Sequence, residues 1–432
     1  MKRGFYTIMS AQFFSSLADN ALFVAAVELL RTEGAPEWQR AALVPMFALF
    51  YVVLAPFVGA FADALPKGKV MFISNAIKVV GCLMMLFGSH PLMAYAVVGL
   101  GAAAYSPAKY GILTELLPAS QLVKANGWIE GLTIASIILG VLLGGQLVGQ
   151  HLSVLLLSID IPLIDTGVDT AAESAIAALI LVYMVAAWFN TRIPHTGVEM
   201  RPLRTDPSRN VLANTLALLP DFWTCNNRLW RDRLGQISLA TTTMFWGLSG
   251  NMRYIVLAWA AAALHYSTTQ AASLVGVVAL GTAVGAVVAS MRVRLDRATQ
   301  VMPLGILMGA LLVAMVYVDH LWVAVPFLVF MGALGGYIVV PMNALLQHRG
   351  HNLMGAGRSI AVQNFNEQAC ILALGALYSA ATAGGLSAFG AIALLGSVVM
   401  AVMLIIQLWH RHNLRHHTAQ VEHLLEVARK DH

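Results

Sequence analysis

The chain contains little charge. Only 11% of its 432 residues are Asp, Glu, Lys or Arg, while 59% are hydrophobic, whereas soluble domains carry about 25% charged residues. So little polar surface could not cover so much apolar mass in water, which excludes a soluble multidomain enzyme. The mean hydropathy of +0.74 predicts instead an all-α polytopic membrane protein, because an apolar run of about 20 residues spans a bilayer as one helix.

Cysteine is also scarce. Cys82, Cys225 and Cys370 are odd in number and far apart in the sequence, so they fit neither a disulfide framework nor a metal site. The formal net charge of +5 is too small and too spread out for a nucleic-acid partner. We therefore expect no metal, no cofactor and no nucleic acid.

Two sequence motifs, one for ATP binding and one for acyl transfer, are missing. The only Gly-Lys step is Gly68-Lys69, and Val70 follows it, so the chain has no phosphate loop of an ATP-driven pump. No histidine has an aspartate five positions downstream, the spacing that a glycerolipid acyltransferase uses for general-base chemistry. The sequence predicts that the protein is not an enzyme.

The histidines of the C-terminal tail suggest a metal site at first sight. His410 is the first of these histidines. The spacing between them does not enforce the geometry that metal ligands need. Apolar residues in the same tail, including Leu414 and Val421, predict instead a short amphipathic helix at the inner leaflet.

Long apolar runs are abundant. Twelve of them are long enough to span a bilayer. They cover residues 5–30, 41–63, 69–88, 92–114, 127–149, 174–193, 236–263, 271–291, 299–317, 321–346, 357–381 and 385–409. The first run is interrupted by Asp19 and Asn20 but continues to Leu30, which favours an uncleaved span over a signal peptide.

The basic residues predict the orientation. Most of the 26 Lys and Arg residues fall in segments that place both termini in the cytoplasm, whereas Arg31 and Arg40 fall outside. The longest soluble segment is rich in arginine and separates six spans from six, which predicts two pseudo-symmetric six-helix bundles. The predicted organisation is a bundle over 1–193, a cytoplasmic linker over 194–235, a bundle over 236–409 and a cytoplasmic tail over 410–432.

The end of the second span carries a loop motif. Residues 59–69 read GAFADALPKGK, which resembles the signature loop of the major facilitator superfamily. Gly59 would let two helices approach closely, and Asp63 would cap or pair at a helix end. Gly68 follows Asp63 by five residues where three is usual. We expect Gly59, Asp63, Lys67 and Lys69 to stabilise a closed state at the cytoplasmic side.

Several longer strings carry a closer resemblance. They are SSLADNALF (15–23), GAAAYSPAKYGILTEL (101–116), LVKANGWIE (122–130), VVPMNALLQHRG (339–350) and GAGRSIAVQNFNEQ (355–368). Together they resemble the bacterial lysophospholipid transporter family over nearly all twelve spans. The resemblance implies a monomeric facilitator that moves lysolipids from the outer to the inner leaflet of the bacterial inner membrane. A cytoplasmic-side acyl-ACP synthetase/acyltransferase would reacylate them there, as a possible partner beside the membrane lipids.

Charged residues lie inside the predicted spans. Each costs at least about 2.5–3.5 kcal/mol on insertion scales, so each calls for a partner or a role. Asp19, with Asn20 beside it, lies in span 1, Lys109 in span 4 and Arg253 in span 7, and these spans line the cavity in the superfamily that the chain resembles. We predict a polar pocket that binds a zwitterionic headgroup. The alternative is that Asp19 and Arg253 pair and hold the two halves together.

The two halves carry matching polar residues. Superposing them pairs Asp19 with Arg253, Lys109 with Asn343, and Glu130 with Asn364. Lys109 and Glu130 should lie at the same depth in the membrane. The sequence favours neither an ion pair between them nor substrate binding over the other. Asn343 and Asn364 can hydrogen-bond each other or a ligand.

Two further residues complete the candidates. Glu367 lies one turn beyond Asn364 and joins the predicted substrate site, whereas we expect Lys78 to form a structural pair. Because Asp19 or Glu367 could carry a proton, the main alternative function is a proton-coupled drug or metabolite antiporter of the same fold.

Overall fold

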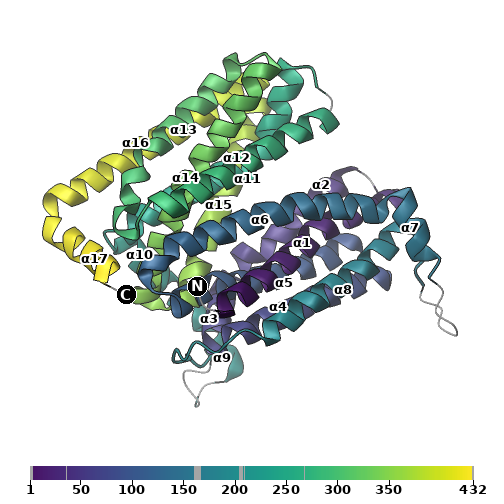
Figure 1. Cartoon of the computed structure of the whole chain (residues 1–432), viewed down its shortest axis with the longest axis horizontal. Helices are drawn as coiled ribbons and strands as arrows, with labels where there is room; N and C mark the ends of the chain where they lie inside the picture. The colour runs from purple at the N-terminus through teal and green to yellow at the C-terminus, as the bar shows by residue number, and fades with distance from the viewer. Residues whose placement is uncertain are drawn as a thin grey trace. The chain divides into compact units, whose positions relative to one another are not determined.

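The protein is described by a computed structural model, in which residues 3–35, 37–159, 167–203, 208, 210–266 and 268–430 are described (Figure 1). All regular elements of these residues are helical. The first eight are α1 (Arg3–Thr32), α2 (Glu37–Val53), α3 (Ala55–Ala64), α4 (Lys67–Leu86), α5 (Pro91–Leu116), α6 (Ala119–Val148), α7 (Gln150–Leu157) and α8 (Ala171–Thr191). The others are α9 (Val211–Leu216), α10 (Leu218–Arg231), α11 (Gly235–Ala263), α12 (Thr268–Arg292), η1 (Leu295–Val301), α13 (Pro303–Ala314), η2 (Met315–Tyr317), α14 (Leu321–Met354), α15 (Ala356–Ala383), α16 (Ala388–His416) and α17 (Thr418–Lys430).

Each predicted span coincides with a helix or with consecutive helices. The second span is broken, because α2 and α3 meet at an angle of 65°. Pro56 lies in the first turn of α3. Proline lacks an N–H and its ring clashes with the carbonyl four residues earlier, which ends α2 just before it.

Within the described residues, eight helical segments are long and apolar enough to cross a membrane, or nine if the bent α2–α3 pair is one span. The protein is therefore a multi-pass membrane protein. Helices α5, α11 and α15 do not meet the same criterion. Helices α11 and α15 carry many polar residues, among them Asn251 and Glu367, whereas α5 consists largely of small and aliphatic residues and contains Lys109. The predicted total of twelve spans and the cytoplasmic position of both termini stay predictions.

The chain forms two compact units. Unit 1 comprises Met1–Glu115, Leu132–Phe222 and Ala356–Ala361, and unit 2 comprises Leu116–Gly131, Trp223–Gly355 and Val362–His432. Helices α6 and α15 are thus each divided between the two units. In unit 1, α8 packs along both α1 and α4, and its core includes the fully buried side chains of Leu22, Ile176 and Tyr183.

In unit 2, α12 packs closely along α14 because glycines line the contact. A Cβ atom on Gly285 would lie 1.8 Å from the carbonyl oxygen of Ala333. One on Gly336 would lie 2.1 Å from the carbonyl oxygen of Thr282. Real Cβ atoms never approach backbone so closely, so only glycine permits this backbone-to-backbone packing.

The C-terminal tail is helical, as predicted. Helix α17 follows α16 after one residue and buries Val421 and Ala428. Arg429 Nε donates to Asp296 Oδ2 in η1 at 3.2 Å. The short helix α7 follows α6, and residues 160–166 after it lie outside the described residues.

Candidate functional site

Asp19 lies in a buried cluster of polar side chains contributed by α1, α4 and α8 of unit 1. Its Oδ2 atom is 2.7 Å from Lys78 Nζ, and its Oδ1 atom accepts a hydrogen bond of 2.6 Å from the Tyr183 hydroxyl. Lys78 Nζ also donates to Ser15 Oγ at 2.9 Å, and Ser15 Oγ donates to Asn75 Oδ1 at 2.7 Å. These five residues form the Asp19 cluster.

Lys78 is held as a charged side chain deep in the apolar interior. Only 1% of its side chain is exposed, against 18% for Asp19. Its Nζ atom lies 4.9 Å from the centroid of the Tyr105 ring, where the ring face attracts a cation. Gly101 makes room for the lysine, because a Cβ atom there would lie 2.7 Å from Lys78 Cγ. The structural pairing predicted for Lys78 is confirmed, and its partner is Asp19.

The structure shows that Asp19 has a cationic partner within its own unit. Arg253, predicted as its counterpart, lies in α11 of unit 2 and is exposed. The pairing of Asp19 with Arg253 stays a prediction. Asn20, beside Asp19, donates from Nδ2 to the Ser16 carbonyl at 2.8 Å, and so hydrogen-bonds within its own helix.

Lys109 and Glu130 lie in different units. Lys109 Nζ is 4.4 Å from the centroid of the neighbouring Tyr110 ring in α5, and Glu130 is buried in α6 with 3% exposure. The ion pair and the substrate contact considered for them both stay predictions.

A second polar cluster lies in unit 2, between α14 and α15. Gln363 Nε2 donates to Asn343 Oδ1 at 3.0 Å and to Glu367 Oε1 at 2.7 Å. The predicted residues Asn343 and Glu367 are therefore brought together by Gln363. Asn364, the other predicted residue, is half-buried on the same helix.

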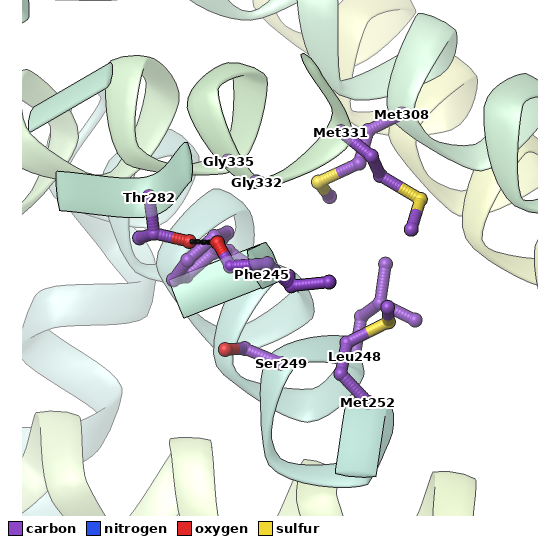
Figure 2. A pocket seen from close by; sticks show the side chains of 10 residues that line it. Phe245, Leu248, Ser249, Met252, Thr282, Met308, Met331, Gly332 and Gly335 are labelled. Carbon is purple, nitrogen blue, oxygen red and sulfur yellow. Dashed lines mark hydrogen bonds between the residues drawn. The ribbon is translucent and has the colours of Figure 1, made fainter. Parts of the chain in front are cut away.

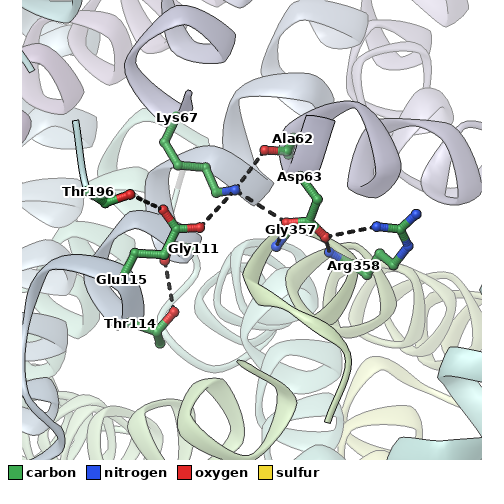
Figure 3. A network of polar contacts seen from close by, with 9 residues as sticks. All are labelled: Ala62, Asp63, Lys67, Gly111, Thr114, Glu115, Thr196, Gly357 and Arg358. Carbon is green, nitrogen blue, oxygen red and sulfur yellow. Dashed lines mark hydrogen bonds and ion pairs between the residues drawn. The ribbon is translucent and has the colours of Figure 1, made fainter. Parts of the chain in front are cut away.

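The predicted gate loop forms a network around Asp63, which Figure 3 shows. Asp63 Oδ1 accepts from the Gly357 N–H at 2.7 Å, and Oδ2 accepts from the Arg358 N–H at 3.0 Å. The guanidinium of Arg358 lies 3.3 Å from the same Oδ2 atom. Asp63 therefore caps the first turn of α15, where free N–H groups and the helix dipole favour an anion.

Lys67 connects this network to α5. Its Nζ atom lies 3.3 Å from Asp63 Oδ1 and 3.0 Å from Glu115 Oε1, and it donates to the Ala62 carbonyl at 2.7 Å (Figure 3). Glu115 also accepts from the Thr196 hydroxyl at 2.8 Å. Arg358 Nε also lies 2.9 Å from Asp221 Oδ2, so three carboxylates, one lysine and one arginine are paired in this network.

The remaining two gate residues behave differently. A Cβ atom on Gly59 would lie 2.7 Å from Ala361 Cβ, so glycine allows α3 to reach the first turn of α15. Lys69, in contrast, is exposed, and the described bonds of Asp63 are to Lys67, Gly357 and Arg358. The structure gives no support for Lys69 in this network.

An apolar pocket lies within unit 2 between α11, α12, α13 and α14 (Figure 2). Met252, Met308 and Met331 line it together with Phe245, while the Thr282 hydroxyl bonds the Val278 carbonyl at 3.0 Å. Its volume is about 30 Å³, which is the share of one water in the liquid. Methionine side chains adapt readily to apolar guests.

Sequence reasoning missed several residues of these clusters, four of which show why. Tyr183 gives no signal, because a tyrosine in an apolar run is ordinarily core. Glu115, Arg358 and Gln363 each lie within a string that carries the resemblance, but their partners come from distant segments. No group of three or more metal-ligating side chains that could hold a metal ion occurs in the described part of the chain.

Residues 8–373 match the family described as Major Facilitator Superfamily. The fold agrees with that of the human organic anion transporter MFSD10 at a TM-score of 0.68, with 14% identity over 94% of this chain and 100% of the other. The chain belongs to the major facilitator superfamily.

Curated relatives are similar over most of the sequence. The lysophospholipid transporter LplT of Yersinia enterocolitica is 38% identical over 385 residues, covering 88% of this chain and 87% of the relative. LplT of Yersinia pestis is 37% identical over the same shares. The sequence prediction of this resemblance is confirmed.

Proposed function

We propose that this protein transports lysophospholipids across the membrane by alternating access. The observation that carries the proposal is the 38% identity, over 88% of the chain, to a relative named lysophospholipid transporter. Charged clusters inside apolar helices support it, because a membrane-embedded charge is costly and marks a polar substrate path.

The Asp19 cluster is the proposed site for a cationic amine of the headgroup. Lys78 is almost completely buried behind the carboxylate, whereas 18% of the Asp19 side chain is exposed. An ammonium group would therefore approach Asp19 from its open side and share the carboxylate with Lys78. Lys109 and Arg253 would then bind the phosphate, for which a guanidinium offers two parallel hydrogen bonds.

The unit 2 cluster is proposed to complete the headgroup site. Asn343 and Glu367 are fixed by Gln363, which orients them without using all of their acceptor capacity. With Asn364 and Asn20 they would bond glycerol hydroxyl groups. The acyl chain would stay in apolar surroundings, and the Met-lined pocket of Figure 2 offers flexible walls against which it could pack.

The direction of transport follows from the chemistry of the substrate. Lysolipids would move from the outer to the inner leaflet of a bacterial inner membrane, where an acyl-ACP synthetase/acyltransferase consumes them. Removal by reacylation makes net inward movement downhill. The protein itself would be a monomeric facilitator with no enzymatic activity and no cofactor.

The Asp63 network is the proposed cytoplasmic gate. Separating α3 from the first turn of α15 must break two backbone hydrogen bonds to Asp63 and its contact with Arg358. With Lys67 and Glu115 bonded in the same network, Glu130 and Lys69 would have at most supporting roles in that gate.

A leaflet-resolved uptake assay tests the function. Purified protein in vesicles would be offered labelled lysophosphatidylethanolamine and lysophosphatidylglycerol on one side. We expect inward movement that Asp19→Ala reduces more for the ethanolamine lipid, because only that headgroup carries an amine. Arg253→Ala should reduce both, since both retain the phosphate.

Matched controls separate the site from general damage. Leu142 is a lipid-facing candidate with 60% exposure, so Leu142→Val at equal membrane density should transport normally. Equal loss of both lipids in Asp19→Ala would reject the amine assignment. No movement by the unmodified protein, with the vesicles intact, would reject lysolipid transport altogether.

A further inference from the structure

A cavity of about 290 Å³ lies in unit 1, where α4 begins and α8 ends. It is separate from the Asp19 cluster and does not include Asp63. Its walls include the first turn of α4, the last turn of α8 and the residues that follow α8. The volume equals the share of about ten liquid waters, which is ample for a phosphodiester group.

One wall contains a buried amide without a partner. Asn190 is only 2% exposed and lines the cavity, yet no described residue hydrogen-bonds to its Nδ2 or Oδ1 atom. Buried polar atoms are nearly always hydrogen-bonded. Because both amide atoms are closed off from a water-sized probe in this rotamer, a turn of the side chain toward the cavity would present a donor and an acceptor to its occupant.

The cavity lining also contains basic side chains. Lys69 lines the cavity from the first turn of α4 and is exposed, and His195 faces it from the segment after α8. Pro66 precedes the helix and has no side chain that could cap it, while its carbonyl accepts from the Lys69 N–H at 2.9 Å. The N–H groups of Lys67 and Gly68 then remain at the helix N-terminus, where the backbone favours an anion. None of the residues lining this described cavity is acidic.

A buried carboxylate at the end of α5 is bonded within the Asp63 network. Glu115 bonds to Lys67 at 3.0 Å and accepts from the Thr196 hydroxyl. It is also absent from the cavity lining. An anion beside Lys69 would therefore meet no competing negative charge among the described lining residues.

The surroundings indicate a lipid. Phe72 lines the cavity and is 42% exposed, and Trp188, one turn before the end of α8, is 52% exposed. The Arg192 guanidinium lies 4.8 Å from a Trp188 ring centroid. Exposed aromatic and basic residues at one helix end are typical of the membrane–water interface, and basic pockets between helices there bind anionic headgroups.

We propose that this cavity binds the headgroup of an anionic phospholipid from the cytoplasmic leaflet. Lys69 and the N-terminus of α4 bind the phosphate, and the Asn190 amide bonds the phosphate or a glycerol hydroxyl. Gly68, which follows Asp63 by five residues in the loop motif, belongs to this site. A Cβ atom on Gly68 would lie 3.0 Å from both the Asn190 carbonyl oxygen and Ile193 Cβ, so glycine brings the first turn of α4 against the end of α8.

The test measures lipid binding rather than transport, so it stands or falls separately from the proposed function. Native mass spectrometry of the detergent-purified protein would titrate phosphatidylglycerol into wild type, Lys69→Gln, Asn190→Leu and the control Lys430→Gln. Lys430 is an exposed lysine of the tail. We expect each site variant to weaken high-affinity phosphatidylglycerol binding about tenfold, as for loss of a charge-assisted hydrogen bond. The control should bind as wild type does.

Two outcomes would overturn the proposal. Unchanged phosphatidylglycerol binding in Lys69→Gln, an exposed position whose change should not impair folding, would mean that water alone satisfies Asn190. Displacement of the lipid by millimolar inorganic phosphate, with no preference for the diester, would identify a free-anion site instead. A second variant, Asn190→Asp, should also weaken binding, because it adds a negative charge to the same wall.

Discussion

The ion pair between Asp19 and Lys78 can be tested by a double-mutant cycle. The single changes are Lys78→Met, which keeps the length of the side chain, and Asp19→Asn, which keeps the shape of the carboxylate. The double variant carries both changes and leaves no charge in the cluster. A cycle of this kind isolates the pairwise free energy from the separate effects of each change.

The structure sets the expected size. Removing one partner of a buried ion pair costs about 3–5 kcal/mol, because the other charge stays buried without compensation. Asp19→Asn leaves the Lys78 ammonium, on a side chain that is 1% exposed, without its carboxylate partner. Lys78→Met leaves a carboxylate that is 18% exposed without its ammonium partner. We therefore expect Asp19→Asn to lower the free energy of unfolding by about 5 kcal/mol. Lys78→Met should lower it by about 3 kcal/mol, because Asp19 keeps the hydrogen bond from Tyr183.

The assay is thermal unfolding of the purified variants in one detergent. A loss of about 3 kcal/mol corresponds to a fall in Tm of roughly 6–12 °C for a domain of this size. The double variant should regain most of that loss, because replacing both charges by uncharged groups removes the desolvation penalty as well as the attraction. The coupling free energy, which is the sum of the two single losses minus the small loss of the double variant, should then be about 6 kcal/mol.

Additive effects would refute the reasoning. If the two single losses simply sum in the double variant, Asp19 and Lys78 do not stabilise each other. Running the same cycle on Asp19 and Arg253 would then show whether the arginine is the energetic partner that the sequence alone predicts. A large coupling there, with none to Lys78, would reassign the cluster.

Three further outcomes follow from other parts of the molecule. Lysolipid uptake should continue without nucleotide or a proton gradient, and its abolition by an uncoupler while the acyltransferase stays active would favour the antiporter. Asp63→Asn should slow uptake with substrate affinity unchanged within about threefold, because an amide cannot replace the charged cap of α15; lost binding with normal exchange between conformations would contradict this. Gly285→Ala should lower stability by about 1–3 kcal/mol, measured by thermal unfolding, whereas Gly276→Ala, with nothing within 4 Å of the added atom, should not.

The helices were predictable because apolar length is a local property of the chain. The predicted run 321–346 lies within α14 (Leu321–Met354), but the extension beyond it is polar and held by tertiary contacts such as the Arg349–Asp232 ion pair at 2.7 Å. The break before α3 also has a local cause in Pro56, yet its angle of 65° depends on what each half packs against.

The candidate site was predicted only in part. Depth along a helix can be counted from the sequence, which is why Asp19 was identified as an embedded charge that needs a partner. The direction in which a side chain points around the helix depends on packing, so the count could not select Lys78 and Tyr183. Asp63 shows the same limit. Its local partner Lys67 was predicted, but Gly357 and Arg358 lie nearly 300 residues further along the chain, and no local pattern connects them to Asp63.

The contact between α12 and α14 has a consequence for how motion in this protein can be followed. At four glycines an added Cβ atom would lie 1.8–2.3 Å from a facing carbonyl oxygen, so the two backbones are in direct contact (Gly281, Gly285, Gly332 and Gly336). We therefore predict that the two helices move together as one rigid body. A pair of spectroscopic labels placed on them would keep a constant separation through the whole transport cycle, and would serve as an internal ruler against which every other distance change can be calibrated.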